Sequence, residues 1–209
     1  MEEQDNLRGS ILITITLVSV LWIVQFIQMI FGFDWSSYGV IPHEIIGLRG
    51  IIFAPFLHDP YHLTHIASNS LAILILLTVL LNAYPKIALV VLLIIHVLSG
   101  ALVWALAPEG PPHIGISGII YGIAAFLVGS GMFRKDRTSI AISIFVVMMY
   151  GGMVLGFLPQ EGISWQSHLF GAIVGFLLSY LFKEKDKRTL TETELEIHEI
   201  EKHFFEENE

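Results

Sequence analysis

Long apolar runs dominate this chain, and they occur in blocks rather than in alternation with polar residues. Runs of about 18 or more apolar residues are typical of helices that cross a membrane. The pattern therefore predicts an all-α polytopic membrane protein with six spans, of which the last is the shortest. The predicted spans cover residues 11–31, 63–81, 87–106, 114–133, 140–158 and 166–182.

Composition agrees with this class. Hydrophobic residues make up 54% of the 209 positions and charged residues only 14%, whereas a soluble domain carries about 25% charged residues. The chain has no cysteine, which excludes disulfides, thiolate metal sites and a cysteine nucleophile. The first span follows acidic residues and no small-residue cleavage site follows it, so we expect it to be retained as a helix.

The positive charges predict the orientation of the spans. Of the 11 Lys and Arg residues, Arg49 alone falls in an odd-numbered loop, and the others lie in the termini and the even-numbered loops. Because positive loops stay cytoplasmic, we expect both termini inside and loops one, three and five outside.

We divide the chain into a membrane domain, 1–183, and an acidic cytoplasmic tail, 184–209. The capping-box pattern of Thr191 and Glu194 predicts a short helix in this tail.

One serine lies between two glycines at the head of the fourth span. Gly115 and Gly118 remove side-chain bulk on both sides of Ser117, so a substrate or another backbone can approach its hydroxyl. Gly118 and Gly122 are also four residues apart, a spacing typical of helix packing in membranes. Packing is thus the alternative explanation for this stretch.

The second span begins with several polar residues. His65 and Asn69 are four residues apart and share one helix face. A buried amide must find a partner in protein or water, so Asn69 either contributes to a site or joins two helices. A metal site at His58, His62 and His65 is a less favoured alternative, because no HExxH pattern occurs in the chain.

The sixth span carries a single histidine, His168, with Gly171 and Gly175 on the same helix face. If this smooth strip packs against Gly118 and Gly122, His168 meets Ser117 near the outer surface. A histidine within hydrogen-bond reach of a serine is the minimum for activating a nucleophile. His96 in the third span stands alone, which favours a structural or pore-lining role.

Spans two to six contain no Asp or Glu, so any serine chemistry here uses a dyad without a third carboxylate. Tyr121, on the face of Ser117, could orient the imidazole instead. Acyl transfer also needs hydrogen-bond donors for an oxyanion. The Ser117 amide, His65 and Asn69 are the available donors.

Three motifs in this order resemble the rhomboid family of intramembrane serine proteases. They are His65 with Asn69, Gly115-x-Ser117-Gly118, and His168 with Gly171 and Gly175. The spacing of Tyr121 from Ser117 also agrees with the family. Phe56-Leu57-His58 before the second span and Ser164-Trp165 before His168 are similar to segments of bacterial members. The resemblance covers residues 11–182, in the minimal six-helix form. Two features depart from the family pattern. The Trp-Arg pair often found in the family's first loop is absent, which leaves Arg49 without that partner. Ser167 stands where alanine or glycine commonly precedes the catalytic histidine.

The resemblance implies that Ser117 is the nucleophile and His168 the base. It assigns the oxyanion hole to the Ser117 amide with His65 and Asn69. It further implies that the fifth span and first loop gate access for single-pass transmembrane substrates, which are cut near the outer face. No cofactor and no nucleic acid are implied. Membrane lipids are expected partners, and a prokaryotic plasma membrane suits the chain; the oligomeric state is not specified.

Three other functions remain as alternatives. A catalytically silent relative that binds membrane clients would usually lack the serine or histidine. A transporter would place polar residues in both membrane halves, commonly with an inverted repeat. A membrane zinc hydrolase is the least favoured of the three.

Overall fold

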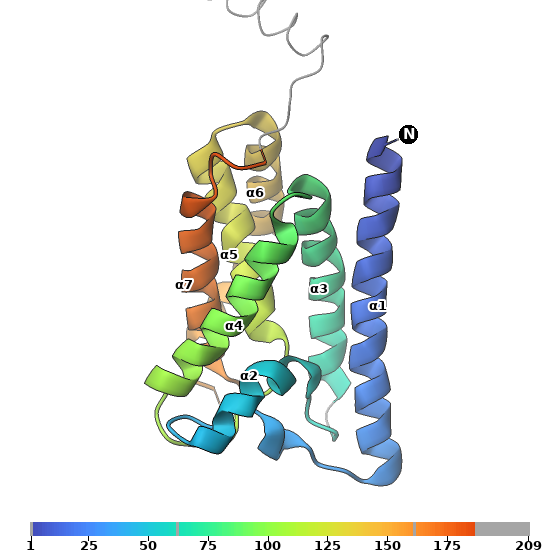
Figure 1. Cartoon of the computed structure of the whole chain (residues 1–209), viewed down its shortest axis with the longest axis vertical. Coiled ribbons are helices and arrows are strands. Elements are labelled where there is room, and N and C mark those ends of the chain that lie inside the picture. The colour runs from blue at the N-terminus through green and yellow to red at the C-terminus, as the bar shows by residue number, and fades with distance from the viewer. Residues whose placement is uncertain (1, 62, 161, 187–209) are drawn as a thin grey trace, which may run out of the picture.

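The computed structural model describes residues 2–61, 63–160 and 162–186, and within these ranges the fold is helical without a strand. The long helices are α1 (Glu2–Phe31), α3 (Leu63–Ala83), α4 (Ala88–Leu106), α5 (Ser117–Arg134), α6 (Arg137–Tyr150) and α7 (Trp165–Leu181). α1 stands beside α3 at one edge of the bundle, and α5 lies behind α4 (Figure 1). Of the predicted tail, 184–209, the short helix predicted at Thr191 and Glu194 lies outside the described residues.

Five of the described helical segments are long and apolar enough to cross a membrane. They are 6–31 of α1, α3, α4, α5, and α6 with its short continuation to Phe157. α7 has 17 residues, so it rises about 25 Å against an apolar layer of about 30 Å. The bundle is that of a multi-pass integral membrane protein.

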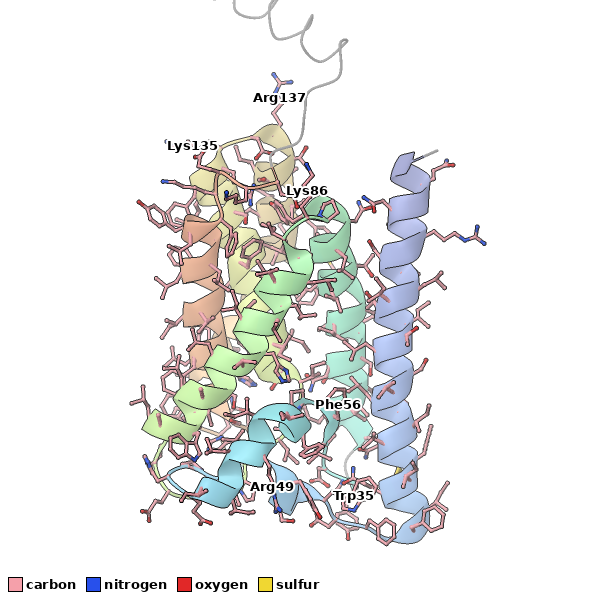
Figure 2. All side chains as sticks on the ribbon, viewed as in Figure 1. Trp35, Arg49, Phe56, Lys86, Lys135 and Arg137 are labelled. Atoms are coloured by element: carbon pink, nitrogen blue, oxygen red, sulfur yellow. The ribbon has the colours of Figure 1, made fainter. Side chains whose placement is uncertain are left out.

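The segment between α1 and α3 folds into short helices at the lower end of the bundle in Figure 1. These are the 3₁₀ helices η1 (Ser36–Tyr38), η2 (Ile45–Arg49) and η3 (Ala54–Phe56), with the single turn α2 (Gly50–Phe53). Arg49 and Trp35 lie at this end, whereas Lys86, Lys135 and Arg137 lie at the opposite end (Figure 2). The labelled basic residues of the even-numbered loops therefore lie at one end of the bundle, and Arg49 of the first loop lies at the other.

α6 ends earlier than the predicted fifth span. It begins at Arg137, where the side chain of Asp136 caps the helix by accepting a hydrogen bond from the Ser139 amide (2.8 Å). From Gly151 to Phe157 the chain continues as the 3₁₀ helix η4. Two consecutive glycines at the junction disfavour the α-helix, and the tighter winding changes the direction of the carbonyl groups that follow.

The central contact of the fold is a backbone-to-backbone seam between α5 and α7. A Cβ atom at Gly171 would collide with the Gly118 carbonyl, and one at Gly175 would collide with the Gly122 carbonyl. One helix can approach another this closely only where side chains are missing. The glycine strips predicted on the fourth and sixth spans therefore face each other.

We expect Gly175→Ala to destabilise the protein by about 1–3 kcal/mol, because the added methyl group forces α5 and α7 apart. Thermal unfolding of the purified protein in detergent measures the effect. Gly9→Ala in α1 is the matched control, since nothing lies within 4 Å of a Cβ at Gly9. Equal melting temperatures for the two variants would contradict the seam.

Candidate active site

The first loop fixes the position of the serine. The Gly115 amide donates to the Ala54 carbonyl (2.8 Å), and His113 pairs with Val40 through two backbone hydrogen bonds. Gly115 has φ +102°, which favours glycine and ends the extended segment. α5 consequently begins at Ser117 rather than at residue 114, and Ser117 is only 6% exposed.

His168 meets Ser117 across the seam. Its Nε2 atom lies 2.8 Å from Ser117 Oγ, and its Nδ1 atom lies 2.8 Å from the Gly156 carbonyl oxygen. A carbonyl oxygen only accepts, so Nδ1 carries the proton and Nε2 is left to accept from the serine hydroxyl. This tautomer is the one that a general base requires.

Tyr121 holds the imidazole from its face. The two rings stack with centroids 4.0 Å apart and an interplanar angle of 5°. The Tyr121 hydroxyl donates to the Met153 carbonyl in η4 (2.8 Å). Tyr121 therefore orients His168 by stacking, while a backbone carbonyl of η4 takes the place that a carboxylate occupies in a triad.

Sequence reasoning missed Gly156. A Cβ atom there would collide with the Tyr121 hydroxyl and lie 3.1 Å from His168 Nδ1, so the close approach requires glycine. The functional atom is a main-chain oxygen, which leaves no signature in the sequence. The available signal was the glycine itself, near the end of an apolar span.

His65 and Asn69 lie on α3, and the His65 ring comes near Gly115. A Cβ atom at Gly115 would be 3.7 Å from His65 Cε1 and 3.8 Å from His58 Nε2. Asn69 is buried, and its Nδ2 atom lies 3.2 Å from His58 Nε2. The His58 and His65 rings meet edge to face at 5.6 Å. The structure thus brings His65 and His58 beside Gly115, two residues before Ser117, and links Asn69 to this cluster through His58.

A cavity of about 710 Å³ opens beside this cluster. Its wall comes from the loop after α4, the loop before α7 and the start of α3, and includes Asp59, His65, Glu109, His113, Trp165 and Gln166. Burial lowers the pKa of His113, and its Nδ1 is hydrogen-bonded to the Ser164 hydroxyl, which is bonded in turn to Ser167. The cavity offers an aqueous approach to the His65 side of the cluster.

The remaining candidates have other surroundings. His96 lines a smaller cavity of about 40 Å³ with Ser99 and His113. Among the described residues no three His, Asp or Glu side chains gather as a metal site, and His62 lies outside those residues.

The geometry that remains is a neutral histidine set to accept the proton of a serine at a helix N-terminus. There the first amide groups have no intrahelical acceptor.

Comparison with known proteins gives similarity over most of the chain. An uncharacterized protein of Mycobacterium tuberculosis is 33% identical over 183 residues, which is 83% of this chain and 75% of that protein. An uncharacterized protein of Mycobacterium leprae is 30% identical over 84% of this chain and 72% of its own length. The Bacillus subtilis protein named "Putative rhomboid protease YdcA" is 27% identical over 60% of this chain and 63% of its own.

The Rhomboid domain family matches residues 47–185, from η2 in the first loop to just beyond the end of α7. The match includes the segments that carry Asn69, Ser117, Gly156 and His168. On this match, and on the identity with the mycobacterial proteins, the chain belongs to the rhomboid family.

Proposed function

We propose that this chain is an intramembrane serine endopeptidase that cleaves single-pass transmembrane proteins with a dyad of Ser117 and His168. The observation that carries the proposal is the pair of 2.8 Å hydrogen bonds made by the His168 ring. They leave one ring nitrogen as a donor to Gly156 and the other as an acceptor for the serine proton.

The reaction follows from that proton arrangement. Ser117 Oγ attacks the scissile carbonyl carbon while its proton moves to His168 Nε2. The protonated ring then gives this proton to the leaving amine, and the C–N bond breaks to leave an acyl-enzyme. Water, deprotonated by the same nitrogen, attacks the ester and releases the new carboxyl end and the free serine.

The tetrahedral intermediates carry a negative oxygen that needs donors. We assign this role to the Ser117 amide at the start of α5, the His65 ring and the Asn69 side-chain amide. The helix N-terminus supports the first of these, because an amide at the first helical position has no intrahelical acceptor and the helix dipole is positive there.

We further propose six membrane spans with both termini cytoplasmic, and a cut near the outer face. Lys86, Lys135 and Arg137 lie at one end of the bundle, and Arg49 lies at the other (Figure 2). The first residues of α5 and α7 lie at the other end, opposite the chain's N-terminus (Figure 1). Since basic loops stay inside, the dyad faces outward. The bacterial relatives favour a prokaryotic plasma membrane.

Ser117→Ala and His168→Ala should each lower cleavage of a single-pass substrate by more than about 1,000-fold, because each removes one half of the dyad. The assay uses purified protein in liposomes and a substrate with an easily unwound outer segment, with and without chelator. Ser19→Ala is the control, since that exposed hydroxyl bonds only within α1.

Activity that survives Ser117→Ala, or that chelator abolishes, would overturn the dyad. A fluorophosphonate label on Ser117 of the wild-type protein gives a second reading that does not depend on the substrate chosen. Absence of both label and cleavage would favour a relative that binds membrane clients without cutting them.

Gly156→Ala should lower kcat by about 10- to 100-fold, because the new methyl group displaces the Tyr121 hydroxyl and the His168 ring. The same liposome assay measures kcat and KM. Gly152→Ala in the same 3₁₀ helix is the matched control, because nothing lies within 4 Å of a Cβ there. If both variants keep wild-type kcat, the Gly156 carbonyl does not position the base.

A further inference from the structure

A second polar cluster lies behind Asn69 and connects it to α1. His58 is 1% exposed, and its Nε2 atom is the partner of the Asn69 amide nitrogen. The backbone that carries His58 is held in turn from α1. Gln28 Nε2 donates to the His58 carbonyl (3.4 Å), and Gln25 Nε2 donates to the Asp59 carbonyl (2.9 Å).

The chemistry of the His58–Asn69 contact fixes the roles of both groups. An amide nitrogen only donates, so His58 Nε2 is the acceptor and its ring proton lies on Nδ1. One N–H of Asn69 is thereby directed to His58. The second N–H of the same nitrogen remains for a substrate oxygen. Without this acceptor the amide can rotate and present its oxygen, which would repel an oxyanion.

His58 keeps this acceptor because its ring stays neutral. Burial first, and the charge of the neighbouring His65 second, lower the pKa of His58 to about 3. A protonated ring would donate from both nitrogens and turn the Asn69 N–H away. At neutral pH the Nε2 lone pair is therefore available to Asn69.

The two glutamines of α1 are unusual for their position. Gln25 and Gln28 are each 1% exposed and lie one helical turn apart in the mostly apolar second half of α1. Amide side chains inside a membrane helix are costly unless they have partners. Gln28 also accepts from the Trp35 amide through Oε1 (3.2 Å). Leucine would satisfy packing here, so the amides point to a positioning role.

We infer that His58 is a positioning residue: it accepts one N–H of Asn69 and so holds that amide as a donor to the oxyanion. Gln28 and Gln25 hold the backbone on which His58 stands. The inference rests on the proposed function, and it extends the site from α3 to α1.

The first test compares two substitutions at His58 in the full-length protein in liposomes. His58→Phe keeps a planar ring without an acceptor, and it should lower kcat about 5- to 10-fold with little change in KM. His58→Gln supplies a side-chain oxygen that can accept from Asn69, and it should recover most of that loss. His43→Asn, at an exposed histidine of the first loop with φ +63°, is the control.

The second test asks whether His58 acts through Asn69. Combined with Asn69→Ala, His58→Phe should cause no further loss of kcat, because the amide that it positions is gone. Gln28→Leu should lower kcat about 2- to 5-fold. Its control is Thr16→Val, whose exposed hydroxyl bonds only within α1. This variant leaves His58 intact, so it decides the matter even if His58→Phe does not fold.

The outcomes separate this inference from the proposed function. An active wild type with equal kcat in His58→Phe and His43→Asn would overturn the positioning role alone. Additive losses in the double variant would do the same. A wild type that neither cleaves nor takes the fluorophosphonate label would overturn both. ¹⁵N spectra of the His58 ring provide a check independent of catalysis, because a protonated Nε2 would refute the hydrogen bond on which the inference stands.

Discussion

The close contact between α5 and α7 is the constraint on which the rest of the site depends. Ser117 and His168 belong to helices that meet at Gly118 and Gly171, where one backbone touches the other. In a membrane, apolar surface gains little from packing against other apolar surface, so close van der Waals contact is what holds such helices together. The same absence of side chains brings the serine hydroxyl within 2.8 Å of the imidazole. The same close contact between α5 and α7 therefore stabilises the fold and brings Ser117 to His168.

The seam alone leaves the imidazole free to rotate, and η4 supplies the missing restraint. Helical carbonyls normally point along the axis to amides of the next turn and are unavailable to side chains. After Gly151 the chain winds as a 3₁₀ helix, and the Met153 and Gly156 carbonyls accept from Tyr121 and His168 instead. In the proposed dyad, a main-chain dipole would serve where a soluble enzyme places a buried carboxylate. In an apolar layer this choice avoids the large desolvation penalty of an unpaired charge.

The sequence predicted those features of the fold that depend on the type of side chain, or on its absence at glycine. The apolar runs predicted the long helices, and the spacing of Gly118, Gly122, Gly171 and Gly175 predicted the facing strips. The structure starts α5 at Ser117 and ends α6 at Tyr150, which differs from the predicted bounds. A backbone turn at Gly115 and a change to 3₁₀ winding at Gly151 interrupt runs that remain apolar. The roles of Ser117, His168, His65 and Asn69 stay predictions that the geometry supports.

The sequence could not predict hydrogen-bond partners whose position depends on the path of the backbone. The Gly156 carbonyl has no side chain to reveal it. The link from His58 to Asn69 depends on a loop whose course is set by hydrogen bonds from α1. These hidden partners share a physical origin. A polar group in an apolar layer is costly without a partner in the protein, and His168, Tyr121 and Asn69 each have such a partner. Buried polar residues distant from the dyad, such as Gln25 and Gln28, are then understood as the outer end of the same hydrogen-bonded structure.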